Sequence, residues 1–379
     1  MKNSELNPFV IGKYVSEEYF CDREKETEML LRQVQNGRNV TLISDRRIGK
    51  SGLISHLFAQ PVMQKHYYTI SVDLYATSSM AELVCLFGNE VYRCIQTQRN
   101  SWKEKFFQII SSFRVGFKLD PVSGSPAFDI AIGDIVAPVM TLEQIFAYLE
   151  ESDKPCVVAF DEFQQIGEYQ EKNVEALLRT HIQRCKKTRF IFAGSRKHVM
   201  TQMFLSPSKP FYQSTINMGL EPIPKEVYVT FAQRMFAKGS KLIDAEAVER
   251  VYTLCRGVTW YMQVLLNEMY VLTAVQEKCS EAEMDMALQN VVLLQEPFYR
   301  EFLAALPQKQ KVVLYAIVKE GEAKNVASKS FIDKYKLESA SSVQTAIKGL
   351  YAKDILVKTD DVWRVYDVFF AHYIMRYML

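Results

Sequence analysis

Residues 39–58 read NVTLISDRRIGKSGLISHLF: a short β-branched run, a polar loop and the start of a helix. The loop closes on Gly49-Lys50-Ser51, the end of the G-x-x-x-x-G-K-[ST] pattern. In this pattern backbone N–H groups face a polyphosphate, the lysine reaches its β and γ oxygens, and the serine hydroxyl ligates Mg²⁺. The stretch therefore predicts a phosphate-binding loop between a strand and a helix.

Ser44 stands where the pattern has its first glycine. Either this position does not need a positive φ, or the loop carries some strain. We expect nucleotide contacts along the whole loop, from Ser44, Asp45, Arg46, Arg47, Ile48, Gly49, Lys50, Ser51 and Gly52.

The composition is that of an ordinary globular protein, with 48% hydrophobic and 24% charged residues. A chain of 379 residues exceeds one comfortable core, so two or three domains are expected. The formal net charge of +2 excludes a bulk polycation. Any contact with nucleic acid would have to come from a local patch.

The spacing of the cysteines and the hydropathy of the chain indicate the cellular compartment in which the protein is expected. The seven cysteines are scattered without C-x-x-C spacing, which predicts reduced thiols rather than a disulfide frame or zinc site. The first residues lack an apolar signal core, and no stretch approaches 18 uninterrupted apolar residues. We expect a cytoplasmic protein that does not span a membrane.

Strand and helix patterns alternate through the first 220 residues, which predicts a mostly parallel sheet between helices. Asp22 is expected to cap a first helix through Leu30 and Val34. The expected domains are a core over 1–222 with a hairpin insertion at about 112–133, a helical domain over 223–295, and a last domain over 296–379.

A second constellation is residues 156–162, CVVAFDE, an apolar strand that ends in two carboxylates. Ligands of an open parallel sheet bind at this edge, so Asp161 is expected to meet the metal held by Ser51. Glu162 is suited to polarise an attacking water. The other interpretation is a helix N-cap with an acidic first turn.

A third strand, residues 189–193, ends in Gly194-Ser195-Arg196. Ser195 could orient the γ-phosphate or its water, although a plain turn after a buried strand predicts the same residues. Arg196, Arg46 and Arg47 are candidates for contacting transition-state charge, and such an arginine can also come from another subunit.

Downstream, residues 254–263 read LCRGVTWYMQ, with Gly257 ending one helix and Trp260 and Tyr261 beginning the next. In a lid-like helical domain this turn would close over adenine and ribose. A helical hairpin with an aromatic core is the alternative.

Together, CDRE at 21–24, Ser44 to Ser51, FDE at 160–162, Gly194-Ser195 and RGVTWY at 256–261 resemble the archaeal-type ATPase family, of the AAA+/STAND branch of P-loop NTPases. The resemblance covers most of the chain. It implies an α/β fold with a RecA-like ASCE core in three layers, a helical lid and a C-terminal winged helix. Many relatives carry glycine at the place of Ser44 and proline near Val258 or Thr259.

The last 80 residues fit a winged helix on their own terms, with three helices at 308–319, 328–335 and 341–353 and a hairpin at 355–365. The third helix would be the recognition helix. Residues 296–379 hold thirteen Lys/Arg and ten Asp/Glu, a small excess for a DNA-binding domain. Residues 341–365 could contact DNA, or the domain could dock a partner protein or a second copy.

The sequence thus predicts Mg²⁺-dependent ATP hydrolysis by an AAA+/STAND-type switch or motor, with Lys50, Glu162, Ser195 and Arg196 as catalytic residues. Ser51 and Asp161 would hold Mg²⁺. Trp260 and Tyr261 would join the loop in binding ATP. No Asn-Lys-x-Asp segment for guanine is present. The alternative is a non-catalytic, nucleotide-binding regulator or scaffold whose winged helix binds DNA or protein.

Overall fold

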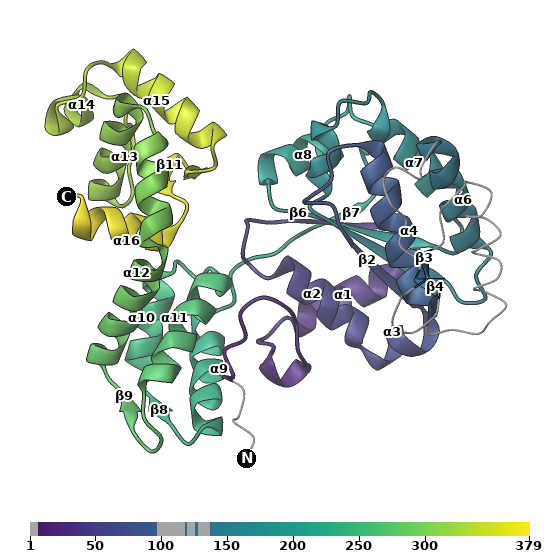
Figure 1. Cartoon of the computed structure of the whole chain (residues 1–379), viewed down its shortest axis with the longest axis horizontal. Helices are drawn as coiled ribbons and strands as arrows, with labels where there is room; N and C mark the ends of the chain where they lie inside the picture. The colour runs from purple at the N-terminus through teal and green to yellow at the C-terminus, as the bar shows by residue number, and fades with distance from the viewer. Residues whose placement is uncertain (1–6, 97–117, 120–125, 128–136) are drawn as a thin grey trace. The chain divides into compact units, whose positions relative to one another are not determined.

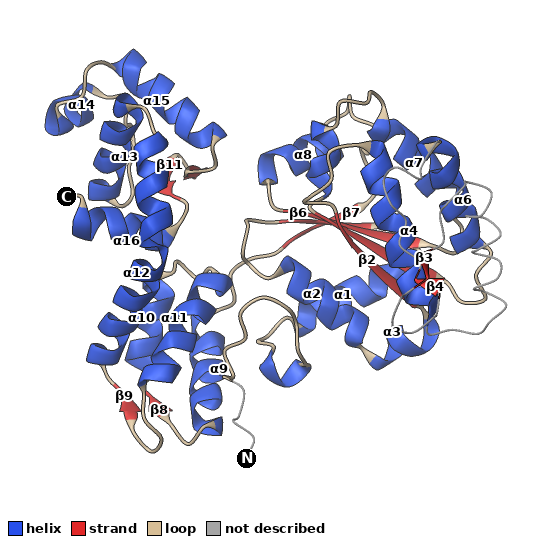
Figure 2. Cartoon of the chain, viewed as in Figure 1, coloured by secondary structure: helices blue, strands red, loops and turns tan. Residues whose placement is uncertain are grey.

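The computed structural model describes residues 7–96, 118–119, 126–127 and 137–379. These residues form two compact units, one of residues 12–223 and one of residues 1–11 with 224–379. We call them the P-loop unit and the C-terminal unit. Figures 1 and 2 show the elements of each. The finer division into three domains stays a prediction.

The P-loop unit is built on a five-stranded sheet in which all neighbouring strands are parallel. The strand order is β2-β5-β6-β1-β7, so β6 separates the strand before the loop from the strand that ends in two carboxylates. The strands are β1 (Val40–Ile43), β2 (Tyr68–Asp73), β5 (Cys156–Asp161), β6 (Arg189–Gly194) and β7 (Ile216–Gly219).

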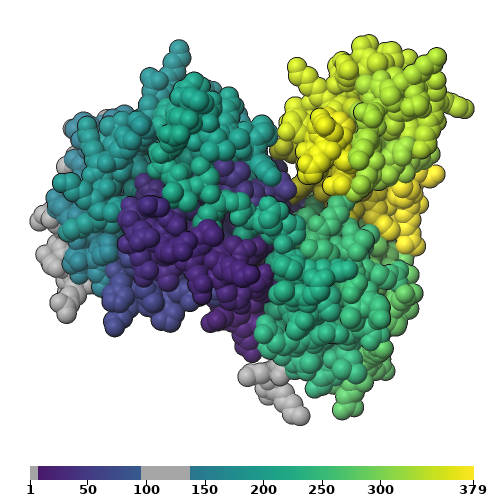
Figure 3. Space-filling view, turned by 180° about the vertical axis from the view of Figure 1, so that it is seen from behind, coloured from purple at the N-terminus to yellow at the C-terminus, as the bar shows by residue number. Residues whose placement is uncertain are grey.

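Helices cover both faces of this sheet, with α1, α2 and α3 on one face and α4, α6, α7 and α8 on the other (Figure 1). Their bounds are η1 (Glu17–Tyr19), α1 (Glu24–Gln35), α2 (Lys50–Ala59), α3 (Pro61–His66), α4 (Met80–Gln96), α6 (Pro138–Glu150), η3 (Phe163–Glu168), α7 (Val174–Arg184) and α8 (Lys197–Leu205). In the space-filling view, the purple N-terminal part of the unit lies at its surface (Figure 3).

Strand residues alternate between the two apolar layers because successive side chains point to opposite faces. In β5, Val157 and Ala159 join the layer under α1 and α2, whereas Val158 and Phe160 join the layer under α4 and α6. Burial on both faces explains the uninterrupted apolar run. The predicted three-layer α/β core is confirmed.

Asp22 does not cap α1, and that expectation was wrong. The N-cap is Arg23 at φ 84°, without a side-chain cap. Arg23 is 3% exposed, and its guanidinium donates to Glu26 Oε1 at 2.6 Å and to the carbonyl oxygen of Glu221 at 2.7 Å. These charge-assisted contacts hold the left-handed turn, which also gives Asp22 a positive φ.

The expected hairpin near 112–133 falls largely outside the described residues. Within them, β3 (Lys118–Leu119) pairs antiparallel with β4 (Pro126–Ala127).

The C-terminal unit begins with a helical part. Its elements are α9 (Lys225–Lys238), β8 (Leu242–Ile243), α10 (Ala245–Leu254), α11 (Thr259–Leu272), β9 (Lys278–Cys279) and α12 (Glu281–Ala305). Residues 7–11 fold with this unit, where Phe9 is fully buried against Phe231, Phe236 and Tyr270. Among the described residues, every helix is too short or too polar to cross a bilayer.

The end of the chain has the three helices and hairpin of a winged helix. They are α13 (Gln308–Glu320), α14 (Lys329–Tyr335), α15 (Ala340–Ala352), β10 (Leu356–Thr359) and β11 (Val362–Val365), followed by α16 (Val368–Tyr377). The two strands pair antiparallel, and Ala323 bridges to Trp363. Val343, Ile347 and Leu350 bury one face of α15, while Gln344 and Lys348 are exposed on the other.

Candidate active site

The loop after β1 turns twice through left-handed backbone, at Arg47 (φ 64°) and at Gly49 (φ 104°), before α2 begins at Lys50. Ser44 does not have a positive φ. A side chain at that position therefore introduces no left-handed strain, which decides between the two explanations for the missing glycine. A Cβ on Gly49 would meet nothing within 4 Å, so glycine is required there for its backbone conformation alone.

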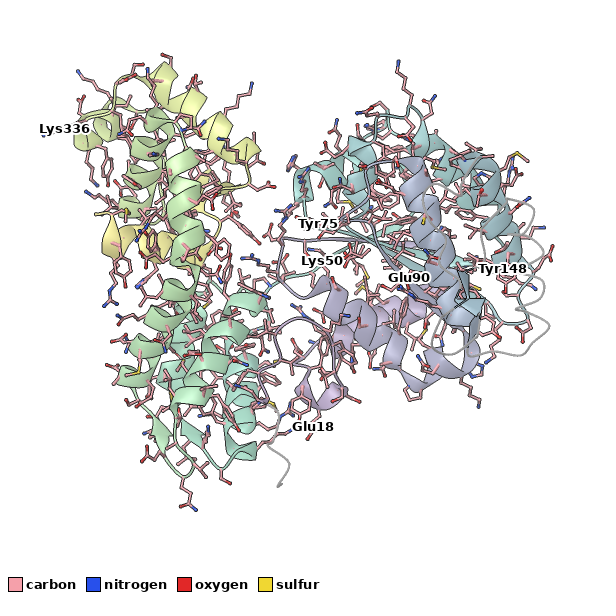
Figure 4. The ribbon with its side chains drawn as sticks, viewed as in Figure 1. Glu18, Lys50, Tyr75, Glu90, Tyr148 and Lys336 are labelled. Carbon is pink, nitrogen blue, oxygen red and sulfur yellow. The ribbon has the colours of Figure 1, made fainter. Side chains whose placement is uncertain are left out.

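Lys50 is 5% exposed, and its ammonium donates to the carbonyl oxygens of Ser44 at 3.1 Å and Asp45 at 2.6 Å. Burial lowers the pKa of this ammonium below its ordinary value, and the charges of Glu162, Asp161 and Asp45 oppose that shift. Figure 4 shows Lys50 at the end of the sheet where Tyr75 follows β2, opposite the end where Tyr148 lies. This is the edge formed by the carboxyl ends of the strands.

Ser51 and Asp161 meet at this edge, where the Ser51 hydroxyl donates to Asp161 Oδ2. Burial raises the pKa of Asp161, and the charges of Glu162 and Asp73 add to the rise, while hydrogen bonds from Ser51 and from the Glu162 N–H oppose it. Asp73 lies beside Asp161 because their strands pair in register. The site thus gathers the oxygen atoms of Ser51 and Asp73 around the buried carboxylate of Asp161.

Glu162 is held by a chain of hydrogen bonds that spans three elements. Its Oε2 accepts from Ser195 Oγ at 2.7 Å and from Gln164 Nε2. Arg46 Nε donates in turn to Ser195 Oγ at 3.1 Å. The loop after β1 and the ends of β5 and β6 are therefore joined through polar side chains. The catalytic roles of Ser195 and Glu162 stay predictions.

The structure gives other contacts to three further sequence-predicted residues, Arg196, Trp260 and Tyr261. Arg196 forms an ion pair with Glu168, with Nη1 and Oε1 2.8 Å apart. Tyr261, in the C-terminal unit, is fully buried, and its ring packs edge-on against Phe369 at 5.1 Å and against Trp260 at 5.2 Å. These are contacts of an aromatic core, so adenine binding by Trp260 and Tyr261 stays a prediction.

Two residues of the site were missed from sequence. Gln164 follows Asp161-Glu162 by two positions, and only the polar character of Gln164-Gln165 in an otherwise apolar segment signalled it. Asp73 ends an apolar strand just as Asp161 does, and that parallel could have placed it at the same edge.

Comparison with known proteins supports the same fold. A family model described as "Probable winged helix domain" matches residues 297–376. No curated protein matches the chain. Among solved structures, the Walker-type ATPase PABY2304 of Pyrococcus abyssi is similar with a TM-score of 0.68 and 19% identity, over 97% of this chain and 99% of that one.

The ORC2 protein of Aeropyrum pernix, in its ADPNP–ADP complexes, is similar with a TM-score of 0.62 and 13% identity, over 96% of this chain and 93% of that one. Its ADP form gives a TM-score of 0.55 at 13% identity, over 95% and 93% of the two chains. At such identities the likeness concerns the fold. The chain shares its fold with an archaeal Walker-type ATPase and an archaeal ORC2 protein, and its last residues match a winged helix domain, as the sequence resemblance implied.

Proposed function

We propose that this chain binds ATP and hydrolyses it with Mg²⁺, as an AAA+/STAND-type switch or motor. The observation that carries the proposal is the meeting of three motifs at one sheet edge, through the Ser51–Asp161 and Ser195–Glu162 hydrogen bonds. Ligands of open parallel sheets bind at such an edge. The similar structures include a Walker-type ATPase and an ORC2 protein in complex with ADPNP and ADP, which supports this proposal.

The donor set fits a nucleotide with Mg²⁺. A hydroxyl and a carboxylate are the hard oxygen ligands that Mg²⁺ takes, since it keeps several waters and phosphate oxygens. Burial disfavours the charged forms of both Lys50 and Asp161. A bound polyanion beside Lys50 and a cation beside Asp161 would relieve both penalties.

Each residue then has a defined task. Lys50 and the N–H groups at the start of α2 would bind the phosphates, and Ser51 and Asp161 would hold Mg²⁺. Mg²⁺, when bound, neutralises charge on the phosphate oxygens. Glu162 would accept a hydrogen bond from the attacking water and orient it, while Ser195 and Arg46 keep the carboxylate in place. Arg196 is a further candidate for contacting transition-state charge.

The test separates binding from turnover. Lys50→Ala is expected to abolish ATP binding, whereas Glu162→Gln should bind ATP normally and slow its conversion by about 100-fold or more. The measurement is the identity of the nucleotide retained by purified protein after incubation with Mg²⁺ and ATP. ATP retained by Glu162→Gln, with ADP on wild type, supports the proposal.

The alternative function is a regulator that holds ATP without hydrolysing it. Under that reading wild type and Glu162→Gln retain ATP alike. Ser44 does not favour this alternative, because its φ is not positive and the position does not require glycine.

We further propose that the winged helix docks a protein partner rather than duplex DNA. Four of its basic side chains form ion pairs with carboxylates. The turn between β10 and β11 carries Asp360 and Asp361, whose negative charges would repel phosphates. The pairs are Lys309–Glu338, Lys334–Glu320, Lys358–Asp361 and Arg364–Glu322, at N–O distances of 2.5 to 2.7 Å.

Fluorescence anisotropy with a labelled duplex tests this choice. We expect no saturable binding at an ionic strength of about 0.15 M. Saturable binding that Lys348→Ala weakens, while Lys319→Ala outside residues 341–365 does not, would assign those residues to DNA and overturn the proposal.

A further inference from the structure

Gln164 is buried at 3% exposure in a segment that otherwise packs with apolar side chains. Its neighbour Phe163 is fully buried, with its ring 4.6 Å from that of Phe192 and 5.3 Å from that of Phe211. The backbone before it is fixed as well, since Glu162 has a φ of 51°, a left-handed conformation that non-glycine residues adopt at an energetic cost. This turn brings the side-chain amide of Gln164 into contact with the carboxylate of Glu162.

The Gln164 amide is only half satisfied. Its Nε2 donates to Glu162 Oε2, whereas its Oε1 is buried and has no hydrogen-bond partner among the described residues. The opposite amide orientation would put the amide oxygen against the carboxylate oxygen Oε2, so the contact with Glu162 fixes the orientation. An apolar side chain of the same volume would avoid the unpaired oxygen, which indicates that the amide is retained for its N–H.

Gly194, at the end of β6, makes room for this amide. A Cβ on Gly194 would lie closer to Gln164 Oε1 than real Cβ contacts allow, and would also collide with Met200. The backbone φ of Gly194 is not positive, so conformation does not require glycine there. Glycine is required there because the side chains of Gln164 and Met200 approach its Cα closely.

We propose that Gln164 is a positioning residue for Glu162. Together with Ser195 it places two donors on one carboxylate oxygen, Oε2, and so leaves Oε1 to accept from the attacking water. This inference rests on the proposed ATP hydrolysis and adds to it a residue that acts only through Glu162.

The first test compares Gln164→Leu with wild type and with Gln165→Leu, a neighbouring amide that makes no side-chain hydrogen bond with the described residues. For Gln164→Leu we expect kcat to fall by about 10- to 100-fold, with the ATP dissociation constant within about 3-fold of wild type. Gln165→Leu should keep the kcat of wild type.

Thermal unfolding gives a readout that a structural role would not produce. Because Gln164→Leu removes an unpaired buried oxygen, its Tm should equal or exceed that of wild type while its kcat falls. A residue that merely fills the core would lose stability and activity together. Gln164→Met, which keeps the length of the side chain without the N–H, serves as the second variant if leucine prevents folding.

A double-mutant cycle completes the test. In a Glu162→Gln background, Gln164→Leu should change the single-turnover rate by less than about 2-fold, because the residue it positions is already altered. Unchanged kcat in Gln164→Leu, or equal effects in both backgrounds, would overturn the inference while leaving ATP hydrolysis intact. A wild type that binds ATP without any turnover contradicts the proposed function instead.

Discussion

Asp161 illustrates how a buried charge prepares a site for a cation. Its pKa is raised first by burial and then by Glu162 and Asp73, so in the absence of ligand its ionised form is disfavoured in the folded protein. A carboxyl whose folded pKa lies above its unfolded value of about 3.9 destabilises the protein at neutral pH, and this penalty disappears as the pH falls below both values.

Asp161→Asn should therefore leave the ligand-free protein equally or more stable at pH 7, because it removes the buried charge. It should also abolish the stabilisation by Mg²⁺ and ATP, which reaches about 2.7 kcal/mol for wild type at a ligand concentration 100 times the dissociation constant. Differential scanning fluorimetry with and without the ligands measures both effects. A variant with full Mg²⁺-dependent stabilisation would remove Asp161 from the metal site.

At this scale the sequence predicts roles for residues whose chemistry is tied to a spacing, such as Lys50, Ser51 and Asp161, and the structure brings the last two into contact. It missed Gln164 because its role depends on a left-handed turn at Glu162 and on the bare Cα of Gly194, which is 30 residues away along the chain. No local pattern encodes that approach.

Among the elements, α6 is tied to the loop before β6 by one carboxylate. Glu150, the last residue of α6, accepts hydrogen bonds from the backbone N–H groups of Lys186, Lys187 and Thr188 at 2.6 to 3.2 Å. Burial acts to raise the pKa of Glu150, but these donors outweigh it, and the pKa lies below its ordinary value. The loop leads into the strand that places Ser195.

Glu150→Gln should lower the free energy of unfolding by roughly 1 to 2 kcal/mol at pH 7, because a neutral amide accepts these N–H groups less strongly. Since the folded pKa is lowered, the contribution of Glu150 is complete above its unfolded pKa of about 4.3 and is lost as the pH falls through the folded value. Urea unfolding of both proteins at pH 7 and near pH 3 should show the difference narrowing in acid. A difference independent of pH would argue against a charge effect.

Strands and helices could be predicted from the sequence where burial gives a clear apolar run or a helical spacing of apolar residues. The apolar runs of β5 and β6 and the amphipathic helices of the winged helix are predicted within one or two residues of their observed bounds. The edge strand β7, Ile216–Gly219, was not recognised, since four residues of mixed polarity carry no periodic signal. The start of α1 was misread because tertiary contacts of Arg23 overrode a local cap.

At the scale of the whole molecule, the C-terminal unit is built from two segments that are far apart in the sequence. Residues 7–11 fold with residues 224–379, so the chain passes between the units at two places, after Ile11 and before Pro224. Two side-chain amides join these segments. Asn7 Nδ2 donates to the backbone oxygen of Asn267 at 3.0 Å, and Asn267 Nδ2 donates to the backbone oxygen of Phe9 at 2.7 Å. A segment this short has no pattern from which the sequence could reveal its place.

Phe9→Ala should destabilise the C-terminal unit by about 3 kcal/mol or more, because it empties a fully buried aromatic site. Ile11→Ala, at a position that is 44% exposed, is the control. Hydrogen exchange should show faster exchange in residues 224–272 of Phe9→Ala, with little change in α2 and β5. Equal protection in the two variants would mean that Phe9 contributes little to this unit.

The central claim, that the P-loop unit is an ATPase, is tested most directly by phosphate release from ATP by the purified chain. Wild type is measured with Mg²⁺ and with a chelator, beside Lys50→Ala and Glu162→Gln. The account predicts release that requires Mg²⁺ and is lost in both variants. Release that persists in Lys50→Ala, or none from a wild type shown to bind ATP, would contradict it.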